Sequence, residues 1–201
     1  MEIVSHAFWA ATIAKKVNKK IKKPIHVWQG AFWGIFPDLL AFTPLFIWLF
    51  VQFIMGDLTF SNFLPQFRQP GVAQQSASVF ETSGANGNLS IFQLTSSLYD
   101  IGHSLVTFAI VFGVLFLIFR RPIWELGGWL LHILIDIPTH SYNSYPTPIL
   151  WPFSEWKFSH GLTWGTPWIL MLNYSAIIVV FFLVWRKKKK GGFSHFHNHG
   201  L

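Results

Sequence analysis

Long apolar stretches without charge constrain the fold of this chain more than any other feature. Three stretches contain no charged residue, namely Leu39–Met55, Ser104–Phe119 and Trp168–Trp185. A helix needs roughly 20 apolar residues to cross a bilayer, so each of the three can cross once its flanks are included. A fourth stretch, Ile123–Ile137, carries Glu125, His132 and Asp136, and it can cross only if these side chains face protein. The sequence predicts an all-α, polytopic membrane helical bundle of about four spans plus an N-terminal helix.

The composition excludes most alternatives to a membrane protein. Of the 201 residues, 52% are hydrophobic and only 11% are charged, whereas about 25% charged residues is usual. A chain with so few charges can neither cover a water-facing surface nor remain disordered. There is no cysteine, which excludes disulfides, a thiolate metal site and a cysteine nucleophile.

The basic residues predict the orientation. Thirteen of the 15 Lys and Arg residues lie in three clusters, at Lys15–Lys23, Arg120–Arg121 and Arg186–Lys190. A four-span model places all three clusters on one side and the remaining two, Arg68 and Lys157, on the other. The positive-inside rule makes the clustered side cytoplasmic. These basic clusters border apolar segments, as the flanks of membrane helices do. We therefore expect the chain to bind the lipid bilayer and not nucleic acid.

The chain divides into a membrane-embedded domain, 1–190, and a flexible histidine-containing tail, 191–201. Within the domain, the polar stretch 57–97 is predicted to be an outward-facing loop with a short amphipathic helix near 60–67. The segment 139–167 is rich in proline and tryptophan, and its aromatic residues could serve either as an interfacial belt or as a cover over a site. The sequence leaves this choice open.

Ionisable side chains in apolar segments are costly and therefore mark candidate sites. Counted as helix from Lys20, His6 and Asp38 lie at depths of roughly 21 and 27 Å. Counted from Arg121, the depths of His103, His132 and Asp136 are roughly 27, 17 and 23 Å. Residues from four helices thus share one layer, nearer the outer surface than the inner, which predicts a common site.

His132 and Asp136 form an H-x-x-x-D pair, which places an imidazole and a carboxylate on one helix face. Histidine and aspartate ligands without cysteine suit Zn²⁺, Mn²⁺ or Fe²⁺. A bound metal lowers the pKa of water, and Asp38 or Asp136 could orient that water or relay its proton. The alternative for His132 and Asp136 is a structural hydrogen-bonded pair. Asp38 and His103 could instead be helix caps.

The order of motifs resembles a known family. SHAFWA, GIFPDLL, GHSL and GWLLHILIDIPTHS followed by TPILWPFS resemble the YdjM-type membrane-bound metal-dependent hydrolases, a family similar in motif order to the zinc-dependent phospholipase C group. The resemblance implies one to three ions, zinc first, and the ligands His6, Asp38, His103, His132 and Asp136. Further candidate ligands are Asp100, His140 and His160. Where many members have an H-R-x-x-T-H-S element this chain reads YDIGHS, so the first histidine is missing.

The leading functional hypothesis is a multi-pass, metal-dependent hydrolase of the bacterial cytoplasmic membrane. Its site would lie near the outer leaflet, where a phosphoester of a lipid or lipid-linked molecule is the natural substrate. The alternatives are a metal or proton transporter and a non-catalytic membrane protein with a structural metal. A metal-free lipid phosphatase is disfavoured, because Leu126 stands where that family needs arginine. The substrate, the metal and the oligomeric state are left open by the sequence.

Overall fold

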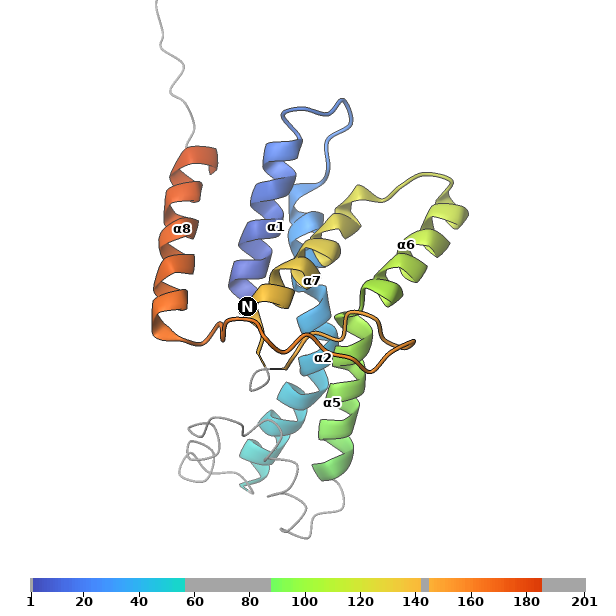
Figure 1. The fold of residues 1–201 in the computed structure, drawn as a ribbon, viewed down its shortest axis with the longest axis vertical. Helices are drawn as coiled ribbons and strands as arrows, with labels where there is room; N and C mark the ends of the chain where they lie inside the picture. The colour runs from blue at the N-terminus through green and yellow to red at the C-terminus, as the bar shows by residue number, and fades with distance from the viewer. Residues whose placement is uncertain (1, 57–87, 142–144, 186–201) are drawn as a thin grey trace, which may run out of the picture.

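The computed structural model describes residues 2–56, 88–141 and 145–185, and the regular elements in these ranges are all helices, with no strand (Figure 1). Only two isolated bridges of β type occur, between Ser141 and His160 and between Thr147 and Phe158. The α-helices are α1 (Ile3–Val17), α2 (Val27–Met55), α5 (Asn88–Gly102), α6 (Leu105–Phe119), α7 (Gly127–Thr139) and α8 (Pro167–Trp185), and a 3₁₀ turn, η1 (Trp124–Leu126), precedes α7.

The basic loop at 18–26 joins α1 to α2 at one end of the molecule. Asn18 closes this loop, since its side-chain amide donates to the Ile25 carbonyl at 2.7 Å and its side-chain oxygen accepts from the Ile25 N–H at 2.7 Å. Glu2 caps the other end of α1 by accepting from the Ser5 N–H at 2.9 Å. The two helices therefore run antiparallel, with the first residues of the chain far from the basic loop.

Small residues let α2 pack closely against α1 and α7. A Cβ at Gly128 of α7 would lie 2.1 Å from the Gly30 carbonyl oxygen of α2, and a Cβ at Gly34 would lie 2.6 Å from the Cβ of Ala10 on α1. Close approach of backbones through small residues is typical of helix contacts in membranes. The core beside this crossing consists of Leu126, Trp129 and Ile133.

The chain bends between α5 and α6, whose axes meet at 63°. Ser104 begins α6, and its hydroxyl accepts from the N–H groups of Val106 and Thr107. Gly102 lies just before the bend, where a Cβ would lie 3.3 Å from the Cα of Pro37. The bend therefore brings the α5–α6 junction against the middle of α2.

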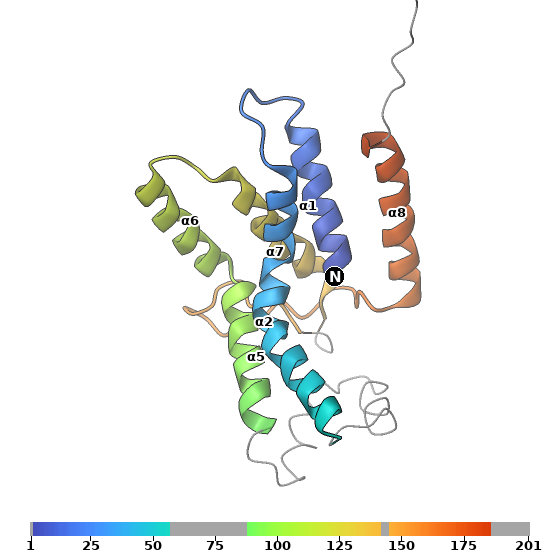
Figure 2. The same ribbon diagram turned by 180° about the vertical axis from the view of Figure 1, so that it is seen from behind.

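The segment 145–166, here called the connecting segment, leads from the end of α7 to α8. It crosses the molecule at the level of the α5–α6 junction (Figures 1 and 2). Backbone bonds hold it at both ends, from Leu162 N–H to the Pro138 carbonyl at 2.8 Å and from Leu105 N–H to the Ile149 carbonyl at 3.1 Å. α8 then runs beside α1 toward the basic end.

Two helices, α2 and α8, are long and apolar enough to cross a membrane, and the bent pair of α5 and α6 would be a third span if counted as one. The four predicted spans are therefore not all found. The stretch Ser104–Phe119 forms the 15-residue α6 after a bend, and Ile123–Ile137 forms η1 and most of the 13-residue α7. Helix α7 rises only about 20 Å, too little to cross a bilayer alone.

The structure also shortens the loop predicted at 57–97, because α5 begins at Asn88. The amphipathic helix predicted near 60–67 and the tail 191–201 lie outside the described residues.

Candidate metal centre

The five predicted ligands come together at one place inside the helical bundle. His6 comes from α1, Asp38 from α2 and His103 from the α5–α6 junction, while His132 and Asp136 come from α7. None of the five residues is more than 7% exposed. The shared layer that the sequence predicts is thus a shared cluster in the structure.

Two histidines of the cluster are oriented by backbone carbonyls. His103 Nδ1 lies 3.0 Å from the Tyr99 carbonyl oxygen, and His132 Nδ1 lies 2.7 Å from the Gly34 carbonyl oxygen. A carbonyl can only accept, so both Nδ1 atoms carry hydrogen and both neutral rings direct the Nε2 lone pair into the cluster. The two Nε2 atoms lie 3.0 Å apart. Lone pairs that face each other so closely need a proton or a cation between them. A histidine that binds a metal typically donates its other ring N–H to a carbonyl or carboxylate, as both rings do here.

Two carboxylates complete a set of four donors. His103 Nε2 lies 3.5 Å from Asp38 Oδ1 and 3.5 Å from Asp136 Oδ2. His132 Nε2 lies 3.7 Å from Asp38 Oδ1 and 3.1 Å from Asp136 Oδ2. Ligands that bind one ion at roughly 2.1 Å lie about 3.0 to 3.4 Å from one another. The measured separations are close to this range, so the residues present fit a divalent metal ion.

The charge of the cluster also favours a cation. Asp38 and Asp136 bring two negative charges into a buried position, where unpaired charges are costly. His103 and His132 each contact both carboxylates. Since the lone pairs of these histidines already face inward, a divalent ion would balance both carboxylates without protonating either ring.

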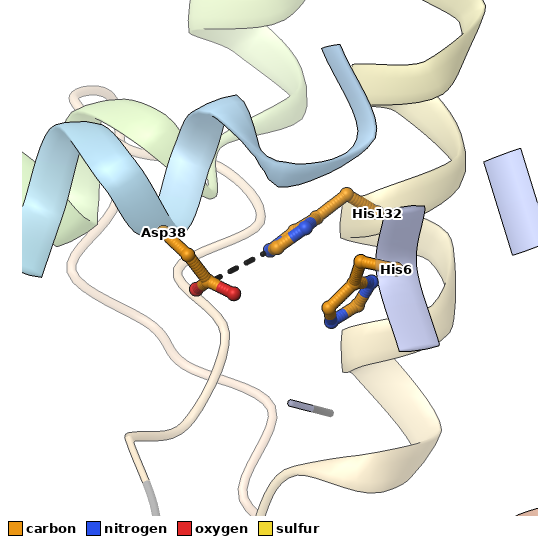
Figure 3. Close-up of side chains that lie close together, drawn as sticks. All are labelled: His6, Asp38 and His132. Atoms are coloured by element: carbon orange, nitrogen blue, oxygen red, sulfur yellow. Dashed lines mark ion pairs between the residues drawn. The ribbon is translucent and has the colours of Figure 1, made fainter. Parts of the chain in front are cut away.

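His6 lies beside His132, and the two rings face the same space as Asp38 (Figure 3). The two rings stack, with centroids 3.7 Å apart, and His6 Nε2 lies 3.0 Å from Asp136 Oδ1. Among the described residues neither ring nitrogen of His6 finds a partner with hydrogen-bond geometry, although both are buried. Buried polar atoms are rarely left in this state, and one ring nitrogen of a neutral imidazole carries a lone pair that could bind a metal ion.

Two overlapping groups of donors could therefore hold a metal ion. One consists of His6, Asp38 and His132, and the other of His103, His132 and Asp136; within each group the donor atoms lie within 4.8 Å of one another. His132 belongs to both groups, but its Nε2 has a single lone pair and can bind one ion. Binding by these residues, and the catalytic roles of Asp38 and Asp136, stay predictions.

The three further candidate ligands have different positions. His140 is buried at the edge of the cluster, with Nδ1 3.3 Å from Asp136 Oδ1. Asp100 pairs with Lys157, whose Nζ lies 2.5 Å from Asp100 Oδ1. His160 is exposed on the connecting segment, in a bridge with Ser141. Neither Asp100 nor His160 belongs to the two donor groups found among the described residues.

Two residues around the site were not singled out from the sequence. Gly34 supplies the carbonyl that orients His132 and lies where α2 approaches α1 most closely. Tyr99 supplies the carbonyl for His103, stacks on its ring at 3.8 Å, and is 2% exposed. Tyr99 precedes His103 by four residues, about one helical turn, and this spacing could have identified Tyr99 from the sequence as a neighbour of His103.

The connecting segment is attached beside the cluster. The Tyr99 hydroxyl donates to the Tyr145 carbonyl at 2.6 Å, and the Ser104 hydroxyl donates to the Trp151 carbonyl at 2.5 Å. Both donors adjoin His103 in space or in sequence. Part of the segment that was considered as a cover is thus held against the helices that carry the candidate ligands.

Comparison with known proteins gives one match. The family model described as YdjM inner membrane protein matches residues 1–196 of the chain. No curated protein and no solved structure matches significantly.

Proposed function

The chain belongs to the YdjM inner membrane protein family, and from this premise we propose that its buried histidine–aspartate cluster is the metal centre of a membrane-bound hydrolase. The proposal depends on one observation above all. His103 and His132, each oriented by a backbone carbonyl, direct their Nε2 lone pairs at each other across 3.0 Å, beside two carboxylates. A divalent cation, zinc first and manganese or iron otherwise, satisfies all four groups together.

The proposed ligands are His103, His132, Asp38 and Asp136, with His6 on the far oxygen of Asp136. When bound, the ion supplies Lewis acidity and a water molecule of lowered pKa. Asp38 is 7% exposed, whereas Asp136 is 1% exposed and has histidines at both of its oxygens. Asp38 is therefore the carboxylate that water reaches more easily, and we assign to it the orientation of the water and the acceptance of its proton. Asp136 holds the histidines.

The proposed substrate is a phosphoester of a lipid or lipid-linked molecule. The basic loop at 18–26 and Arg120–Arg121 lie at one end of the molecule, and the cluster lies away from them (Figure 1). We place the basic end in the cytoplasm, which directs the cluster toward the outer leaflet of the inner membrane. Four crossings, by α2, α6, α7 and α8, remain part of this proposal.

The test begins with the metal. Protein purified in detergent, with the tail after Lys190 deleted, is measured by elemental mass spectrometry beside His132→Ala and Asp136→Asn. His26→Ala is the matched control, because His26 is exposed at the start of α2. We expect near-stoichiometric metal in the parent and the control, and its loss in the two site variants. A folded parent that stays metal-free after incubation with Zn²⁺ and Mn²⁺ would exclude the metal centre.

Catalysis is tested separately on metal-loaded protein. Phospholipids and lipid phosphates in mixed micelles are offered to the parent and to Asp38→Asn, which keeps the shape of the side chain but cannot accept a proton. A general base contributes about 10²–10⁴-fold to a rate, so we expect a loss of at least that order. Because Asp38 is also a proposed ligand, rates are compared only for Asp38→Asn protein whose measured metal content equals that of the parent. Bound metal without turnover of any phosphoester would favour the second candidate, a structural metal that joins α2, the α5–α6 junction and α7. The complete burial of His103 and His132 is the observation that favours it.

A further inference from the structure

Helix α5 has one polar face and one apolar face. Its polar face consists of Gln93, Ser96, Ser97 and Asp100, which follow the i, i+3, i+4, i+7 spacing of one helix face. The first three of these side chains are exposed, and Asp100 is half-buried. A hydroxyl or amide that faces hydrocarbon loses its hydrogen bonds to water and gains none in exchange, which costs free energy. This face of α5 is therefore unfavourable in contact with lipid chains.

The apolar face of α5 packs on the second half of α2. Tyr99 contacts Phe42 at a ring distance of 6.2 Å, and Phe92 contacts Trp48 at 6.2 Å. Since the higher number on one helix meets the lower number on the other, the two run antiparallel (Figure 1). Together they form a two-helix arm that extends beyond the metal centre, away from the basic loop.

The α2 side of this arm has the opposite character. Its exposed residues are large and apolar, with Phe46, Ile47, Phe50, Phe53 and Ile54 between 50% and 67% exposed. They recur every three to four residues and continue a helix that is long and apolar enough to cross a membrane. A face of this size and composition is not stable in water.

The polar face of α5 also continues into the connecting segment. Asp100, at its upper end, pairs with Lys157 Nζ at 2.5 Å, and Lys157 is 31% exposed. A half-exposed ion pair of this kind needs water or headgroups around it. The polar face is therefore continuous with a charged surface, whereas the α2 face is continuous with a lipid-facing helix.

We propose that the membrane boundary runs along this arm, with the α2 face in lipid and the α5 polar face in water or among headgroups. Helix α5 is then an interfacial helix and not the first half of a span. The bent pair of α5 and α6 does not cross the membrane as one element; the bend near His103 is where the chain leaves the water-facing surface. This inference is independent of the proposed hydrolase activity.

The absence of cysteine makes the experiment direct. Ser97→Cys and Phe50→Cys are placed singly in the full chain and reconstituted in lipid nanodiscs, where both surfaces are open to a charged, impermeant maleimide. Lys19→Cys in the exposed basic loop is the water reference, and Val179→Cys, 56% exposed on α8, is the lipid reference. Quenching of a bimane label by spin-labelled lipid is then measured at the same positions.

Each roughly 1.4 kcal/mol of lost solvation slows the thiolate about tenfold. We therefore expect Phe50→Cys to react at least about tenfold more slowly than Ser97→Cys and to be quenched as strongly as Val179→Cys. A Ser97→Cys as slow as Val179→Cys would make α5 part of a span and overturn the proposal. Fast labelling at Phe50→Cys would place the arm in water. Slow labelling there without quenching would mean that protein covers this face. Gln93→Cys and Ile54→Cys repeat the comparison if either first variant does not fold.

Discussion

Helices α7 and α8 are both apolar, yet their surroundings differ completely. Of the 13 residues of α7, the buried ones include Gly128, Trp129, His132 and Asp136. Of the 19 residues of α8, only Ile169 and Asn173 are buried. Helix α7 lies against α2 and α1, whereas α8 packs mainly on α1 and reaches α2 only where Trp185 contacts Trp28 at a ring distance of 6.3 Å (Figures 1 and 2).

Both helices are apolar, but their hydropathy does not say which of them packs against protein. Lipid solvates apolar side chains as well as other side chains do, so burial alone does not attract a helix to its neighbours. The small and polar residues of a helix determine whether it packs against its neighbours. Helix α7 has glycines at the crossing and two site residues on one face, while α8 has a single buried polar residue.

The largest expected effect comes from the glycine contact of α7. Gly128→Ala places a Cβ 2.1 Å from the Gly30 carbonyl, so α2 and α7 must separate. We expect a loss of at least about 1–3 kcal/mol of stability, seen as a lower unfolding temperature in detergent. Gly127→Ala is the matched control, because a Cβ there meets nothing within 4 Å. Equal effects of the two substitutions would show that helix propensity, and not packing, governs α7.

A smaller effect is expected at the polar contact of α8. The Asn173 amide donates to Ser5 Oγ at 2.6 Å, and its oxygen accepts from Trp9 Nε1 at 3.0 Å. Hydrogen bonds between membrane helices contribute about 0.6 kcal/mol each, so Asn173→Leu should cost about 1 kcal/mol.

We expect this loss to loosen α8 from α1, measured as less crosslinking between cysteines placed on the two helices. Met171→Leu, at a position 71% exposed, is the control. Unchanged crosslinking in Asn173→Leu would mean that apolar packing alone holds α8.

The smallest effect is expected on the outward face of α8. Ile178 is 57% exposed on a helix with only two buried residues, so Ile178→Val removes a methylene from its outward face. We expect a change within about 0.5 kcal/mol in unfolding temperature measurements. A loss comparable to that of Asn173→Leu would reveal a protein contact on this face, and the contrast between α7 and α8 would then no longer hold.

The five candidate ligands could be found from the sequence because their relative depth was countable. His6 precedes the end of α1 at Val17 by 11 residues, and Asp38 follows the start of α2 at Val27 by 11, so both lie about 16 Å from the basic loop. The absolute depths estimated from Lys20 were too large, because residues 18–26 are not helical. Both arms are shortened and still match, but a depth of about 16 Å lies near the middle of a hydrocarbon core of about 30 Å and not nearer its outer surface.

Other features depend on contacts between distant residues and had no local signal. The bend at Gly102–Ser104 depends on the close approach of Gly102 to Pro37 of α2, so the apolar length of the segment did not predict it. Asp100 was a reasonable ligand by type and position, but Lys157, 57 residues away in sequence, pairs with it. Conversely, only the structure shows that His140 reaches Asp136 beyond Pro138.

The closed basic loop has a consequence for the choice of lipid. The hydrogen bonds of the Asn18 side chain join the two ends of this loop. Each lysine of the loop attracts anionic headgroups by about 1 kcal/mol near the membrane surface. The loop thus anchors the protein to one leaflet, and the rigid helices α1 and α2 set the distance from that leaflet to the cluster. The distance from the cluster to the opposite leaflet then depends on the thickness of the bilayer. Longer acyl chains would submerge the cluster and shorter ones would uncover it, so bilayer thickness becomes a variable that sets access to the centre.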